Sequence, residues 1–174
     1  MSLMRDVRPT IHVVQGTHAV GRDPDCVLGT VLGSCVSACL WDPDSRVGGM
    51  NHIVLPERSG VWSTVASHGA SEMERLINAL VHEGASRPRL RAKVFGGASM
   101  IAGLPDIGRR NAEFLIGYLS REGIPIDSSS LGGNQARMIR FWPHSGRARQ
   151  RLVDRVDEPA PPPTLPVGNG AELF

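Results

Sequence analysis

Two short apolar runs on either side of a turn place the strongest constraint on the fold of this chain. Val36 to Leu40 and Met50 to Leu55 are rich in Val, Ile and Leu, a composition that favours strands. Between them lies Asp42-Pro43-Asp44-Ser45, which is typical of a type I turn. The segment is therefore predicted to form a β-hairpin, around which the rest of the chain is organised.

The expected register of this hairpin brings a thiol and an imidazole together. If Pro43 and Asp44 are the central turn residues, Cys35 lies directly opposite His52, with Cβ atoms about 4.5–5.5 Å apart. At that separation an imidazole can take the proton of a thiol and leave a nucleophilic thiolate. A slip of one residue, for instance through a bulge at Gly48-Gly49, is the alternative register.

The residues before the cysteine favour the same chemistry. Gly33 permits a sharp turn, which would expose the backbone N–H groups of Ser34 and Cys35 to a bound carbonyl oxygen as an oxyanion hole. The structural alternative is that Cys35 is a small buried residue and His52 a strand histidine with its polar atoms satisfied.

An ordered set of motifs over roughly residues 10–155 resembles the CheD family, the chemoreceptor glutamine deamidases of bacterial chemotaxis. The motifs are Leu-Gly-Ser-Cys-Val at 32–36, a Trp-Asp-Pro turn, Gly-Gly-Met-Asn-His-Ile-Val-Leu-Pro at 48–56, Phe-Gly-Gly-Ala-Ser-Met at 95–100, Ile-Gly-Arg-Arg-Asn at 107–111 and Gly-Gly-Asn-Gln-Ala-Arg at 132–137. The resemblance implies that Cys35 and His52 are catalytic. It also implies a third catalytic residue, a threonine upstream of the cysteine. Thr30 is the candidate, although the expected position is one residue further from the cysteine, where this chain has Gly29.

The resemblance further implies a reaction and its partners. The Cys35 thiolate would attack the side-chain carboxamide of a protein glutamine, and His52 would protonate the departing ammonia. The oxyanion or substrate-binding residues would be Gly33, Ser34, Gly96, Gly97 and Asn134. The implied partners are the cytoplasmic domains of chemoreceptors and a CheC-type phosphatase, and no cofactor is expected. The alternative function is a chemotaxis adaptor that docks such partners with little catalysis.

Periodic patterns elsewhere predict two helices and several further strands. Ser71 and Glu74 have the spacing of a capping box, so a helix is predicted from Ser71 to Gly84, after a surface loop over 57–70. A second helix is predicted over 107–122. Further strands are predicted at 9–15, 90–94, 124–126, 136–141 and 147–153. The expected fold is α+β, with mixed or antiparallel sheet layers carrying two main helices, as in cysteine hydrolases.

Length and composition favour one globular domain. A chain of 174 residues with 41% hydrophobic content can bury a substantial core, so a single domain is predicted over 1–157. The proline-dense segment 158–174 is predicted to be a disordered tail. The start of the chain lacks an apolar leader, and the longest uncharged run, Val27 to Trp41, is too short to cross a bilayer. A cytoplasmic protein without membrane insertion is therefore expected.

The cysteines do not indicate a disulfide or a metal site. They are three, an odd number without framework spacing. On a strand, Cys35 and Cys39 would be about 13 Å apart, too far to share a zinc ion. A site built from Cys26, Cys35, Cys39 and His52 is the less favoured alternative.

Basic residues concentrate late in the chain although the net charge is only +2. Arg147, Arg149 and Arg151 occupy alternate positions and are predicted to form a basic stripe on one face of a strand. No nucleic-acid-binding motif accompanies them, so a solvated strand face is expected rather than a nucleic-acid partner.

Overall fold

The computed structural model describes residues 9–56, 62–103 and 106–154, which hold nine strands, two α-helices and one short 3-10 helix. In chain order these are β1 (Ile11–His12), β2 (His18–Gly21), β3 (Leu28–Leu32), β4 (Val36–Asp42), β5 (Val47–Asn51), α1 (Trp62–His82), η1 (Arg87–Arg89), β6 (Arg91–Gly96), α2 (Ile107–Arg121), β7 (Ile126–Leu131), β8 (Ala136–Trp142) and β9 (Arg147–Val153).

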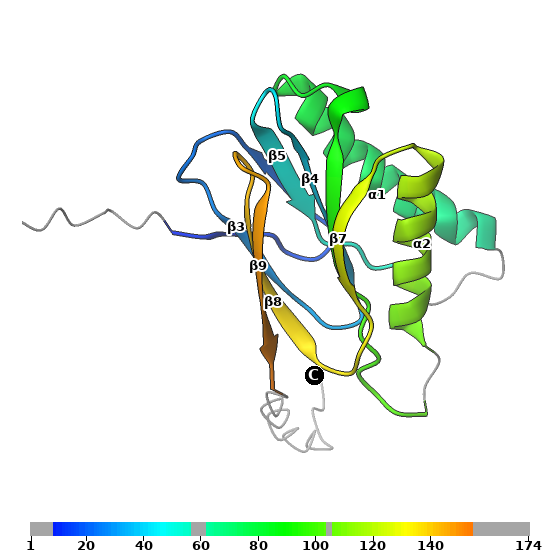
Figure 1. Ribbon diagram of the computed structural model, residues 1–174. Helices are drawn as coiled ribbons and strands as arrows, with labels where there is room; N and C mark the ends of the chain where they lie inside the picture. Colours follow the sequence, from blue (N-terminus) through cyan, green and yellow to red (C-terminus); the bar gives the residue numbers. More distant parts are fainter. Residues whose placement is uncertain (1–8, 57–61, 104–105, 155–174) are drawn as a thin grey trace, which may run out of the picture.

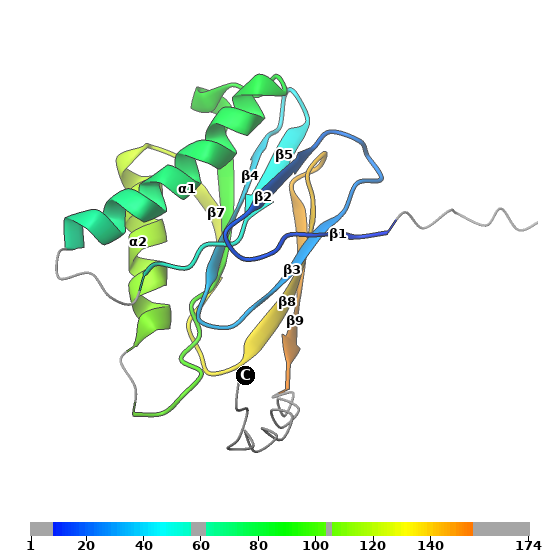
Figure 2. The same ribbon diagram turned by 180° about the vertical axis from the view of Figure 1, so that it is seen from behind.

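The strands form two sheets that pack against each other (Figure 1). Sheet A has the strand order β1-β3-β8-β9, and sheet B has the order β2-β5-β4-β6-β7. Each sheet contains one parallel pair, β1 with β3 and β6 with β7, so both are mixed. Both helices lie on the side of sheet B that faces away from sheet A (Figures 1 and 2). The predicted α+β class, with mixed sheet layers and two main helices, is confirmed.

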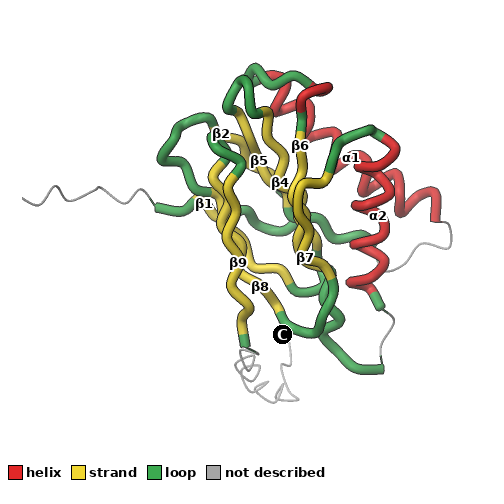
Figure 3. The backbone as a smooth tube through the Cα atoms, viewed as in Figure 1, coloured by secondary structure: helices red, strands yellow, loops and turns green. Residues whose placement is uncertain are grey.

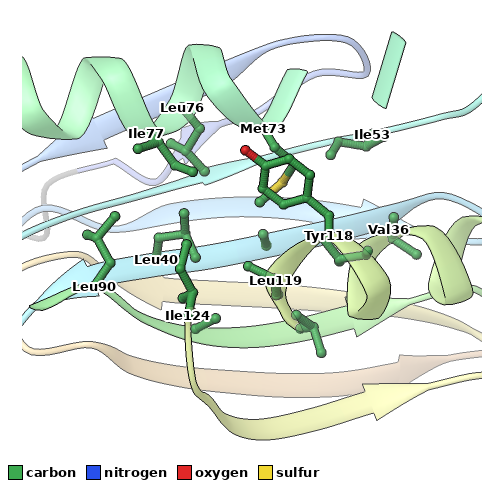
Figure 4. Packing of buried hydrophobic residues seen from close by; sticks show 14 of the residues in the cluster. Val36, Leu40, Ile53, Met73, Leu76, Ile77, Leu90, Tyr118, Leu119 and Ile124 are labelled. Carbon is green, nitrogen blue, oxygen red and sulfur yellow. The ribbon is translucent and has the colours of Figure 1, made fainter. Parts of the chain in front are cut away.

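Two apolar layers hold this arrangement together. One lies between sheet B and the helices, where Met73, Leu76 and Ile77 of α1 approach Val36 and Leu40 of β4 (Figure 4). The other lies between the two sheets, and its fully buried members include Leu28, Leu32, Cys39, Met50, Ile139 and Phe141. Because β4 lies between both layers, all seven of its residues are buried. Truncating one such large side chain to alanine costs about 2–5 kcal/mol.

Helix α1 begins much earlier than the sequence indicates. It starts at Trp62, so the predicted loop is wrong from that residue onward, and Ser71 lies in the middle of the helix. Residues 57–61 of the predicted loop lie outside the described residues. The polar sequence around Ser67 and Gly69 is helical because Gly69 lies against α2, where an added Cβ would be 2.4 Å from Cζ of Phe114. Tertiary packing therefore overrides local helix propensity here.

Of the later elements, α2, β8 and β9 agree with their predicted positions, whereas β7 does not. Helix α2 ends at Arg121, one residue before its predicted end, and its first turn is capped by Asp106, whose side chain accepts from the Arg109 N–H at 2.9 Å. Strands β8 and β9 fall where they are expected, whereas β7 begins at Ile126 and extends five residues further. The sequence predicts neither β2 nor β3, and the second strand of the hairpin covers Val47–Asn51 rather than the predicted Met50 to Leu55. The predicted domain boundary and tail lie outside the described residues.

Candidate active site

A buried threonine and histidine meet between the two sheets. Thr30 lies in the middle of β3, and His52 directly follows β5. Only 2% of Thr30 and 8% of His52 are exposed. Thr30 Oγ1 lies 2.8 Å from His52 Nδ1 and 2.8 Å from the carbonyl oxygen of Val13.

These contacts determine which nitrogen of neutral His52 carries the proton. A carbonyl oxygen can only accept, so the single hydroxyl hydrogen of Thr30 is donated to Val13. The Thr30 oxygen must then accept a hydrogen from Nδ1 of His52. The Val13 carbonyl is also 3.4 Å from Nδ1 and favours the same tautomer. His52 therefore keeps a free lone pair on Nε2, as a general base requires.

The hairpin places Cys35 diagonally from His52. Val36 pairs with Ile53 through backbone hydrogen bonds of 3.0 and 2.8 Å. The pairs between β4 and β5 keep the same register. Cys35 and His52 each precede one member of this pair, so the predicted direct opposition is wrong by two residues. Diagonal neighbours have Cα atoms about 7–8 Å apart and Cβ atoms slightly closer, within reach of a long side chain.

The error of two residues leaves the predicted faces unchanged because side chains alternate with a period of two. Val36 and Ile53 point toward the helices, so Cys35 and His52 point toward sheet A. Cys35 packs against the apolar layer between the sheets, into which Thr30 also projects. Thr30, Cys35 and His52 therefore converge on one layer, although no hydrogen bond joins the thiol to the imidazole within the described residues.

Burial keeps both groups neutral in the unliganded site. It raises the pKa of the Cys35 thiol, an effect that the residue's own backbone N–H offsets only in part. Burial also lowers the pKa of His52; the hydrogen bond to Val13 opposes this effect, and the nearby charge of His12 adds to it. The resting pair is therefore a thiol and a neutral imidazole rather than a preformed ion pair.

The backbone carbonyls at and before the thiol are all fixed by donors from other segments. The Gly33 carbonyl accepts from Ala98 N–H at 3.0 Å, and the Cys35 carbonyl accepts from Gly97 N–H at 2.8 Å. The Ser34 carbonyl accepts from Asn111 Nδ2 at 2.8 Å. No carbonyl or side-chain oxygen of the described residues accepts from the N–H of Ser34 or Cys35. The Cys35 N–H interacts with its own thiol sulfur, and within the described residues both donors are available to an oxyanion.

The Gly96-Gly97 turn supports residues 33–35, which we call the Cys35 loop. Gly96 has φ of +109°, and an added Cβ there would be 2.1 Å from the Cys35 carbonyl oxygen, so only glycine fits. The N–H of Gly97 is already bonded to that carbonyl and is not available to substrate.

Asn134 lies on an exposed loop tied to the same region. The loop after β7 donates from Gly132 N–H to the Gly96 carbonyl at 2.9 Å and accepts at Gly133 from Ser99 N–H at 2.8 Å. The loops after β3, β6 and β7 thus gather at one end of the two sheets (Figure 3). The side chain of Asn134 is exposed at the border of this end.

Nothing in the described ranges resembles a metal site or a membrane span. No three His, Cys, Asp or Glu side chains within the part of the chain that the structure describes lie close enough to hold a metal ion. Cys39 is fully buried in the apolar layer, where burial raises the pKa of its thiol to about 12. None of the helices in these ranges is long and apolar enough to cross a membrane.

Comparison with known proteins identifies the family. Residues 54–152 match the family described as CheD chemotactic sensory transduction. The chain belongs to the CheD family. The matched segment begins two residues after His52, so the assignment does not depend on Cys35 or His52.

Relatives in the CheD family match nearly the whole chain. A protein of Acidiphilium cryptum is 52% identical, with 89% of this chain and 83% of the relative covered. A protein of Caulobacter vibrioides is 50% identical over 94% of this chain and 92% of its own length. A protein of Agrobacterium fabrum is 46% identical over 99% of this chain and 100% of its own length. All three are named probable chemoreceptor glutamine deamidase CheD.

A solved structure, that of the Bacillus licheniformis hypothetical protein YfiH, matches with a TM-score of 0.41 and 17% identity. The match covers 65% of this chain and 49% of that one.

The sequence patterns predict no role for Asn111, but the fold of this CheD-family chain places it beside the Cys35 loop. Asn111 lies on α2, is fully buried, and donates to the Ser34 carbonyl. Its Oδ1 accepts from the Leu55 N–H at 3.2 Å, three residues beyond His52. One side chain therefore holds the Cys35 loop and the segment after His52 together. Its place in the Ile-Gly-Arg-Arg-Asn motif was the only available signal, since the contact spans 77 positions.

Proposed function

We propose that this chain is a chemoreceptor glutamine deamidase, which hydrolyses glutamine side chains on chemoreceptors to glutamate. The observation that carries the proposal is that relatives 46–52% identical over most of both chains bear this name. A free base nitrogen on His52 and unpaired N–H groups beside Cys35 suit amide hydrolysis.

The first chemical step forms a thioester. Once a substrate carboxamide lies against the Cys35 turn, Nε2 of His52 takes the thiol proton as the sulfur attacks the carboxamide carbon. The carbonyl oxygen then carries negative charge, which the N–H groups of Ser34 and Cys35 stabilise. His52 returns the proton to the nitrogen, the C–N bond breaks, and ammonia leaves. Thr30 holds Nδ1–H throughout and keeps Nε2 directed to the reacting atoms.

The second step releases glutamate. Nε2 of His52 takes a proton from water, whose oxygen attacks the thioester carbon. The C–S bond then breaks, and His52 gives that proton to the leaving sulfur, which restores the Cys35 thiol and the neutral imidazole. The only co-reactant is water, so the mechanism requires no cofactor. The proposed setting is the cytoplasm, with the cytoplasmic domains of chemoreceptors as substrates. A CheC-type phosphatase is a proposed regulatory partner on the family resemblance.

Mass spectrometry of a receptor cytoplasmic fragment tests the proposal. After incubation with the chain, specific glutamines should gain the mass expected when NH2 is replaced by OH, with ammonia released in equal amount. Cys35→Ala should abolish both changes. A chain that binds the fragment and leaves every glutamine unaltered would instead indicate the adaptor function.

A further inference from the structure

The outer face of sheet A carries positive charge without an internal counter-charge. Arg140 on β8 and Arg147, Arg149 and Arg151 on β9 are all exposed and project from this face. We call these four residues the basic face. Neither β8 nor β9 contains an Asp or Glu, and no carboxylate of the described residues pairs with any of the four.

The register places these charges close together. Arg140 lies directly opposite Arg149, and Arg151 lies opposite Met138. Like charges in directly opposite positions destabilise a sheet. Positions 147 to 151 span about 13 Å along the strand. An anionic partner along this row would relieve the repulsion.

Three adjoining cavities lead from the basic face to the Cys35 loop. A groove of about 400 Å³ is lined by Met138, Arg140, Arg149, Gln150 and Arg151. It shares Met138 and Arg140 with a cavity of about 200 Å³ that extends to Val31. Val31 in turn borders a third cavity of about 200 Å³, together with Met100 and Asn134.

The last of these cavities reaches the catalytic end of the sheets. Cγ of Met100 lies 3.4 Å from the position that a Cβ on Gly33 would take, so Met100 packs over the turn that precedes Cys35. A peptide segment lying along the three cavities would thus have one end on the basic face and the other beside the Cys35 loop.

We propose that the basic face and the adjoining cavities bind an acidic segment of the protein substrate and deliver its glutamine to the Cys35 loop. The proposal rests on the proposed function for the identity of the substrate. The surroundings of Trp142 on this face favour a protein ligand over a nucleic acid. The ring of Trp142 is covered by the guanidinium groups of Arg147 at 4.1 Å and Arg149 at 5.9 Å, so it is not free to stack on a base.

Binding of a receptor cytoplasmic fragment to charge variants tests this docking surface. The test variant is Arg149→Gln/Arg151→Gln, and Arg149→Lys/Arg151→Lys retains the charge. Arg22→Gln/Arg121→Gln removes the same charge from exposed positions outside β8 and β9 and serves as the matched control. Thermal unfolding verifies that each variant is folded.

The Gln variant should raise the Kd and the KM for the fragment roughly tenfold at low ionic strength, and high salt should abolish the difference. The Lys and control variants should bind like the unaltered chain. Equal weakening in the test and control variants, or no weakening in either, would overturn the proposal. Tighter binding of a duplex oligonucleotide that displaces the fragment would also overturn it.

Binding and turnover separate this inference from the proposed function. If binding depends on the basic face while the unaltered chain releases no ammonia, the deamidase proposal fails and the docking surface stands. If ammonia is released and the Gln variant binds normally, only the docking surface fails.

Discussion

At the scale of single residues, Thr30 acts on His52 through one hydrogen bond. Thr30→Val keeps the shape of the side chain and removes the hydroxyl that holds Nδ1–H. A hydrogen bond between neutral groups contributes about 0.5–1.5 kcal/mol, so kcat should fall roughly two- to thirteenfold. Thr30→Ser should retain most of the activity. Ammonia release gives kcat, and alkylation of Cys35 verifies that the thiol remains accessible. An unchanged kcat in Thr30→Val would remove Thr30 from the mechanism.

The protonation of His52 predicts the pH dependence of the reaction. The active form needs neutral His52, and burial lowers its pKa below the ordinary value of 6.5. As pH falls, kcat/KM should therefore decline with a midpoint below 6.5, where the imidazole gains a proton. A pH–rate profile with a short peptide substrate measures this limb. An acidic midpoint at or above 6.5 would contradict the assigned environment of His52.

At the scale of elements, Asn111 connects α2 to the Cys35 loop and to the segment after His52. Asn111→Ala leaves the Ser34 carbonyl and the Leu55 N–H without partners, at a cost of about 1–3 kcal/mol in stability. Because the Ser34 turn loses its support, kcat should fall more than KM rises. Glu113→Ala, at an exposed position on the same helix, is the control. If kcat falls no more in Asn111→Ala than in Glu113→Ala, Asn111 has only a structural role.

Two helical glycines should respond in opposite directions to alanine. In Gly69→Ala the new Cβ would meet Phe114 at 2.4 Å, which forces α1 and α2 apart and should cost about 1–3 kcal/mol. In Gly117→Ala it would meet only the flexible end of Arg121 at 3.2 Å, so the better helix propensity should stabilise the chain by up to about 1 kcal/mol. Urea unfolding measures both changes. Stabilisation by Gly69→Ala would contradict the close packing of the two helices.

At the scale of the whole molecule, the sequence predicts faces better than registers. The hairpin was expected to have a two-residue turn, but Asp42 pairs with Val47, leaving four residues between them. The Asp42 carboxylate stabilises this loop by accepting from the N–H groups of Asp44 and Ser45 at 2.9 and 3.3 Å. The resulting shift of two residues preserves the side-chain faces, so Cys35 and His52 still share one side of the sheet.

Contacts between distant segments were beyond the reach of sequence patterns. The polar start of α1 becomes helical because Gly69 packs on Phe114, which no local signal indicates. The Val13 carbonyl and the Asn111 amide join the site from segments far along the chain. The predicted basic stripe on β9 could be inferred because alternation alone places its three arginines on one face.

Trapping the thioester distinguishes Cys35 from every other candidate nucleophile of this chain. The chain and a receptor fragment are mixed, quenched with acid within the first turnover, digested and mapped by mass spectrometry. We expect a substrate peptide joined to the Cys35 peptide with loss of one ammonia and released by hydroxylamine. Cys26→Ala and Cys39→Ala should retain this adduct. An adduct on another residue, or glutamine conversion by Cys35→Ala, would show that Cys35 is not the nucleophile.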